Sequence, residues 1–103
     1  MKGIEFLGIA LKKVREFQAL DRNEAGYQLD RVQRGFDPTD WKPMTSVGQG
    51  VREIRIQHEG HYRLIYVASF EERVYVLHAF QKKTRKTGKQ DLGIAKRALK
   101  EVV

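Results

Sequence analysis

The apolar positions in the first third of the chain follow the spacing of helices after a short strand. Residues 3–7 are predicted to open a sheet, and residues 9–20 carry apolar side chains at the spacing of one helix face. Asp21 and Glu24 form a capping-box pattern, which predicts the start of a second helix. Gly35 fits the end of that helix, because glycine adopts the backbone conformation that stops helices. This region therefore predicts two helices joined as a hairpin.

The segment 36–50 contains both prolines and is predicted to be a long connection. Connections of this length are unusual in a compact domain unless they pack against it or have a function. Trp41 and Met44 are expected to plug the edge of the core.

Three strands are predicted in the second half of the chain. Residues 51–58, 61–69 and 73–81 are rich in β-branched and aromatic residues, as is typical of central strands. A last helix is predicted from about Lys89, since apolar residues follow it at helical spacing. The element order is therefore β-α-α-β-β-β-α.

The turn between the first two of these strands, His58-Glu59-Gly60-His61, decides which residues share a face. A three-residue loop with a bulge at Gly60 would place residue 55 opposite residue 65, and Arg55 and Arg63 would then lie on one face. A two-residue loop would separate them, because a slip of one residue inverts a strand. The functional interpretation depends on the first register.

The predicted fold class is α+β. The length of 103 residues favours a single domain over 1–103. Its helices are expected against one face of a small, mainly antiparallel sheet, with the other face partly open.

The charge distribution favours an anionic partner. The formal net charge is +7, and residues 51–103 carry twelve Lys and Arg against six Asp and Glu. No acid occurs between Arg73 and Asp91, a stretch with five lysines and arginines after Arg73. A solvated basic loop is the simpler interpretation, but the position of these charges next to strands favours contact with nucleic acid.

Several function classes are excluded or disfavoured. The chain has no cysteine, which excludes disulfides and thiolate metal sites. It has no long apolar run and no signal-peptide pattern, so we expect a soluble cytoplasmic protein without membrane contact. The sequence HEGH at 58–61 lies on a hairpin and lacks zinc-site spacing, and no phosphate-binding loop is present. No metal and no cofactor is expected.

Four stretches of the chain resemble the RelE/HigB toxins of the RelE/ParE superfamily, above all their phage-associated branch. They are DWKPM at 40–44, GVREIRI at 50–56, HYRLIYV at 61–67 and VLHAFQKKTRKT at 76–87. The resemblance covers essentially the whole chain and implies a RelE-like fold.

This resemblance implies the toxin of a type II toxin–antitoxin system. Such toxins typically cleave mRNA in the ribosomal A site without a metal, and a helix-turn-helix, HigA-like antitoxin neutralises them. The superfamily also contains ParE-like gyrase inhibitors, which are not nucleases, so the fold alone does not decide the activity. A catalytically inactive nucleic-acid-binding module is a further alternative.

Metal-free RNA cleavage requires a base for the ribose 2′-hydroxyl, cations beside the phosphate and an acid for the leaving oxygen. Arg63 is the first candidate, because a charge in a central strand must be paired or face a cleft. Arg55 is either its neighbour in the site or a charge on a solvated strand face. Glu53 is either the base or the ionic partner of a cation, and His78 is either a titrating group or a core histidine.

The resemblance aligns Arg63 and Lys83 with cationic residues of RelE-like toxins. Lys83 would stabilise the phosphate or protonate the leaving oxygen, whereas Lys82 alternates to the other face and is assigned to RNA docking. Thr84 either binds phosphate or caps a turn. The remaining docking residues expected are Arg85, Lys86 and Lys89. A C-terminal tyrosine or histidine that some relatives use is missing, since the chain ends Lys-Glu-Val-Val.

Overall fold

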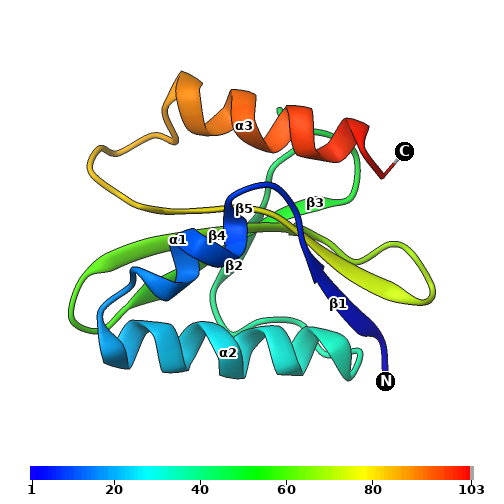
Figure 1. The fold of residues 1–103 in the computed structure, drawn as a ribbon, viewed down its shortest axis with the longest axis horizontal. Helices are drawn as coiled ribbons and strands as arrows, with labels where there is room; N and C mark the ends of the chain where they lie inside the picture. The colour runs from blue at the N-terminus through cyan, green and yellow to red at the C-terminus, as the bar shows by residue number, and fades with distance from the viewer. Residues whose placement is uncertain (103) are drawn as a thin grey trace.

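The computed structural model describes residues 1–102 and contains a five-stranded sheet with helices on both faces (Figure 1). The strand order is β1-β5-β4-β3-β2; β1 runs parallel to β5, and the other three pairs are antiparallel. The predicted α+β class is confirmed. In chain order the elements are β1 (Gly3–Phe6), α1 (Ala10–Arg15), α2 (Ala19–Gln33), β2 (Trp41–Pro43), β3 (Val51–Gln57), β4 (His61–Val67), β5 (Arg73–Gln81) and α3 (Lys89–Lys100).

Two apolar clusters hold the layers together, one on each face of the sheet. On one face, Val14 of α1 and Leu29 of α2 pack with Ile54 of β3. On the other face, Ala95 and Ala98 of α3 pack with strand residues that include Ile65. Helices therefore cover both faces, and the expected one-sided arrangement is wrong, because the apolar stripe of α3 requires a sheet face of its own.

The break between the first two helices lies earlier than the sequence predicts. Helix α1 ends at Arg15 and α2 already begins at Ala19, after the N-cap residue Gln18. The capping-box prediction at Asp21 is wrong, because this fully buried carboxylate accepts hydrogen bonds from the hairpin turn and not from its own helix. The end of α2 is as predicted, and Gly35 follows it with a φ of 93°.

The hairpin between β3 and β4 confirms the shared face of Arg55 and Arg63. Its loop contains three residues, 58–60, and Arg55 lies directly opposite Arg63. The predicted pairing of residue 55 with residue 65 is therefore wrong by two positions, which leaves the faces unchanged. The backbone of Gly60 does not adopt the left-handed conformation. Gly60 lies so close to the Tyr62 ring that a Cβ atom on it would be only 2.8 Å from the ring.

A β-bulge at Leu77 changes the alternation along β5. Val67 pairs with Tyr75 and Tyr66 with Val76, whereas Ile65 pairs with His78. One residue of β5 is thus extra, and every position beyond it is inverted relative to an unbulged strand.

The connection 36–50 contains the short edge strand β2, which the sequence did not predict. Trp41 of β2 pairs with Ile54 of β3. The guanidinium of Arg52 lies over the Trp41 ring, 3.8 Å from its centroid. Trp41 is partly buried at the edge of the sheet and is not a member of either apolar cluster, whereas Met44 is buried as expected.

Candidate functional site

Arg55 and Arg63 form the centre of a cationic surface where β3 and β4 meet. The Arg63 side chain is only 11% exposed, and its Nη1 donates a hydrogen bond of 3.0 Å to the carbonyl oxygen of Tyr62. Arg55 is more exposed and lies 3.2 Å from Oδ1 of Asp40. Burial lowers the pKa of Arg63, the charge of Glu53 opposes this shift, and the neighbouring charge of Arg55 adds to it.

Glu53 is the counter-ion inside this surface. The side chain is fully buried, and its Oε1 lies 3.5 Å from Nε of Arg63 and 3.7 Å from Nζ of Lys42. Its Oε2 accepts a hydrogen bond of 2.7 Å from the hydroxyl of Thr87. These contacts favour the role of ionic partner over that of general base, because the carboxylate faces the groups that it holds.

Lys82, and not Lys83, lies with this cluster. Because of the bulge at Leu77, the side of β5 that carries Phe80 opposite Arg63 continues to Lys82. Burial lowers the pKa of Lys82; Glu53 raises it, and Arg63 lowers it further. The prediction that Lys82 alternates away from the site is therefore wrong.

Lys83 and Thr84 belong to the exposed basic loop, residues 82–89. Lys83 lines a shallow pocket of about 260 Å³ together with Lys82, Lys86 and Lys89. The hydroxyl of Thr84 donates a hydrogen bond of 2.7 Å to the carbonyl oxygen of Lys86. Thr84 therefore caps a turn of this loop, and Arg85 is exposed beside it.

His78 lies beneath α3 and away from solvent. Its side chain is 1% exposed, and Nε2 lies 2.8 Å from Oδ1 of Asp91 in the first turn of α3. The ring also stacks on Phe80, with 5.3 Å between centroids. Burial lowers the pKa of His78, and Asp91 opposes the shift. This environment is that of a hydrogen-bonded core histidine.

Two polar contacts thus fix the C-terminal end of the basic loop and the start of α3 to the sheet. Thr87 binds Glu53 of β3, and Asp91 binds His78 of β5. Sequence analysis missed Thr87, Asp91 and Lys42 as members of the site. Lys42 lies in the predicted connection 36–50, where no site residue was expected. No spacing in the sequence indicates that Thr87 contacts Glu53.

The structure also bears on metal and membrane binding. Within residues 1–102, no three His, Cys, Asp or Glu side chains are grouped closely enough to hold a metal ion. No helix in this part of the chain is long and apolar enough to cross a membrane.

The order of the elements, the mixed sheet and the cationic surface define a small α+β protein of the RelE-like kind. A profile of the family described as phage-derived protein Gp49-like (DUF891) matches residues 12–100. The chain belongs to this family, a RelE-like toxin family of toxin–antitoxin systems, which implies an antitoxin partner. A comparison with curated proteins finds no match.

Proposed function

We propose that this protein is the toxin of a type II toxin–antitoxin system and acts as a metal-independent, ribosome-dependent mRNA endonuclease of the RelE/HigB type. The observation that carries the proposal is the direct pairing of Arg55 with Arg63 on one sheet face. Two guanidinium groups on adjacent rigid strands suit a phosphate that gains negative charge during cleavage.

In the proposed reaction the ribose 2′-hydroxyl forms a bond to the neighbouring phosphorus and releases its proton to solvent water, while the bond between phosphorus and the 5′-oxygen breaks. Arg63 and Arg55 stabilise the charge that develops on the phosphate oxygens, and Lys82 adds a third cation beside them. Glu53 fixes the direction of Arg63. Lys83, which follows Lys82 in the basic loop, would approach from the loop and donate the proton to the leaving 5′-oxygen.

The basic loop would hold the RNA backbone next to these groups. Lys86, Lys89 and Arg85 are exposed and contribute sequence-tolerant contacts to phosphates. The ribosome would orient the mRNA in its A site, which supports cleavage by a site without a complete acid–base pair. In this proposal the protein acts in the cytoplasm, and a HigA-like helix-turn-helix antitoxin neutralises it.

The test is inducible expression combined with mapping of mRNA 5′ ends. Wild-type protein should arrest growth and create new 5′ ends within translated codons. Arg63→Met should remove both effects, and Arg73→Met, which changes an exposed arginine in the same sheet, should retain them. Growth arrest with intact mRNA and a loss of DNA supercoiling would instead support a gyrase inhibitor. Absence of any arrest would support a binding module without activity.

A further inference from the structure

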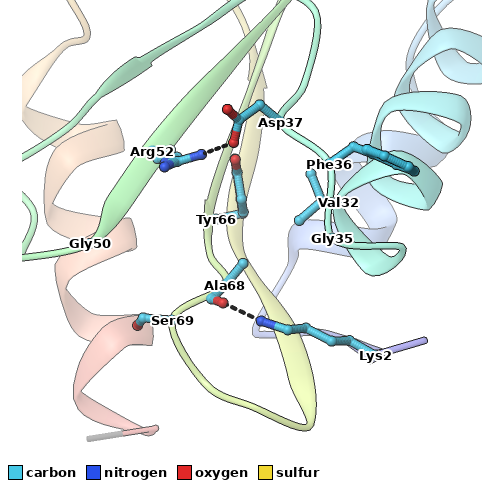
Figure 2. Close-up of a pocket in the computed structure, with 10 residues that line it drawn as sticks. All are labelled: Lys2, Val32, Gly35, Phe36, Asp37, Gly50, Arg52, Tyr66, Ala68 and Ser69. Atoms are coloured by element: carbon cyan, nitrogen blue, oxygen red, sulfur yellow. Dashed lines mark hydrogen bonds and ion pairs between the residues drawn. The ribbon is translucent and has the colours of Figure 1, made fainter.

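Figure 2 shows the residues that line a pocket of about 290 Å³. The pocket lies on the sheet face opposite the cationic surface. Arg52 and Tyr66, which pair across β3 and β4, contribute to its wall. Along their strands, Arg52 precedes Glu53 and Tyr66 follows Ile65. Successive residues of a strand point to opposite faces, so the pocket lies on the face away from Glu53 and Ile65. The pocket opens where α2 ends and the chain turns at Gly35. Nothing in the proposed RNA chemistry uses it.

The buried hydroxyl of Tyr66 in this pocket has no acceptor for its proton. Tyr66 is only 1% exposed, and within residues 1–102 the polar group next to its hydroxyl is the Arg52 guanidinium, which can only donate hydrogen bonds. Burial raises the pKa of Tyr66, while the nearby Arg52 opposes the rise, so the phenol remains a proton donor at neutral pH. Buried polar groups are nearly always satisfied, which makes this hydroxyl an indication of a missing ligand.

The charged side chains that line the pocket around Tyr66 indicate the charge of the ligand. Nη1 of Arg52 lies 2.8 Å from Oδ1 of Asp37, and the guanidinium also faces the Tyr66 hydroxyl. A guanidinium carries five N–H donors, so Arg52 still has donors for a further acceptor. Nζ of Lys2 donates a hydrogen bond of 2.5 Å to the carbonyl oxygen of Ala68 (Figure 2). Two cations and one carboxylate leave a net charge of +1, which matches a monoanion better than a phosphate dianion.

The rest of the pocket is lined by apolar side chains and by glycines. Val32, Phe36 and Ala68 provide the apolar surface, and the glycines at 35 and 50 leave space. Phe36 is 59% exposed, which is unusual for a phenylalanine. The volume is at the lower limit for small-molecule sites, so the ligand is of the size of one amino-acid residue.

We propose that this pocket binds the carboxylate of a small organic acid with an apolar body. The carboxylate accepts hydrogen bonds from the Tyr66 hydroxyl and the Arg52 guanidinium, and the apolar body packs against Phe36 and Val32. Such a group occurs as a free acid or as the C-terminal residue of a partner polypeptide. The proposal does not depend on RNA cleavage, because the two sites lie on opposite faces of the sheet.

The experiment is an NMR titration of the isotope-labelled full-length chain with N-acetyl-L-phenylalanine, and with N-acetyl-L-phenylalaninamide as the uncharged control. We expect saturable shifts at Gly50, Arg52, Tyr66 and Ser69, with the amide binding at least about tenfold more weakly. Equal binding of both compounds, or no binding, would overturn the proposal. Shifts confined to the basic loop would overturn it as well, since a cationic loop attracts any anion.

Two variants and a peptide complete the test. Tyr66→Phe should weaken binding of the carboxylate by about tenfold, whereas Tyr75→Phe, outside this pocket, should not change it. If Tyr66→Phe fails to fold, Lys2→Met is used, and unchanged affinity in the folded variant would contradict the proposal. A ten-residue peptide with a C-terminal phenylalanine distinguishes the sources: tighter binding than the acetylated residue indicates a polypeptide terminus, and weaker binding indicates a free acid.

Discussion

The hydroxyl of Thr87 donates a hydrogen bond of 2.7 Å to Oε2 of the fully buried Glu53 and thereby attaches the basic loop to β3. Oε1 of the same carboxylate faces Arg63 and Lys42. One buried charge thus holds both the arginine of the sheet and the loop that carries the lysines. The geometry of the proposed RNA site depends on this arrangement.

Replacement of Thr87 by valine should weaken RNA binding without altering its salt dependence. Thr87→Val keeps the shape but removes the hydrogen bond, at a cost of about 1 kcal/mol in the free energy of unfolding. We expect about three- to tenfold weaker binding of a short RNA, with an unchanged slope against salt because no charge is lost. The control is Thr84→Val, which removes an exposed turn contact. Equal effects of the two substitutions would show that the link to Glu53 is unimportant.

Glu53→Gln should lower stability and slow cleavage without changing the shape of the pH profile. Removing the charge leaves Arg63 without its counter-ion, which should cost about 3 kcal/mol of unfolding free energy. A misplaced Arg63 should slow cleavage about 10- to 100-fold. Glu71→Gln, in an exposed turn, serves as the control. If the acidic limb of the pH–rate profile vanished in Glu53→Gln, Glu53 would be the general base and our interpretation would be wrong.

The buried His78 should make the protein less stable at acidic pH. Its pKa in the folded state is lowered from about 6.5 by burial, so between the two pKa values the unfolded chain binds more protons. The contribution of the neutral His78 to the free energy of unfolding is therefore fully present above about pH 6.5. Below this pH the free energy of unfolding falls, by at most about 1.4 kcal/mol per pH unit.

Denaturant unfolding at a series of pH values measures this dependence. His78→Gln should flatten the curve directly below about pH 6.5, since glutamine does not titrate. Gln81→Asn, which changes an exposed residue without an ionisable group, should leave the slope unchanged. A slope that persists in His78→Gln would assign the proton uptake to another group.

Asp21 should be among the most important polar residues for stability. Its carboxylate accepts hydrogen bonds from the backbone N–H groups of His58, Glu59 and Gly60 at 2.8–3.0 Å. Asp21→Ala leaves these donors unpaired and should cost about 3 kcal/mol or more of unfolding free energy. The matched control Asp30→Ala removes only an exposed pair with Arg34 and should cost about 0.5 kcal/mol. Similar losses in the two variants would contradict this role.

The strands and the faces of the hairpin were predictable because they depend on local sequence. Runs of β-branched residues indicate β3, β4 and β5, and a three-residue loop fixes the side on which Arg55 and Arg63 lie. Gly35 likewise indicates the end of α2 through its own backbone preference.

The errors have causes that lie elsewhere in the chain. Asp21 has the pattern of a helix cap, but its partners lie 37–39 residues away in the hairpin turn. The bulge at Leu77 decides that Lys82 joins the site, and no residue type at that position indicates a bulge. The short edge strand β2 was not predicted because it contains Pro43, and proline is rare within sheets. Proline is tolerated here because β2 lies at the edge of the sheet.

The most direct test of the proposed nuclease site is the cleavage rate of a defined mRNA by the purified protein, on programmed ribosomes and free in solution. We predict cleavage on ribosomes, and a loss of about 100- to 1000-fold in Arg63→Met, with Arg73→Met cleaving at the wild-type rate. Unfolding curves of each variant separate a lost charge from a lost fold. A folded Arg63→Met protein that cleaves as fast as the wild type would contradict the account.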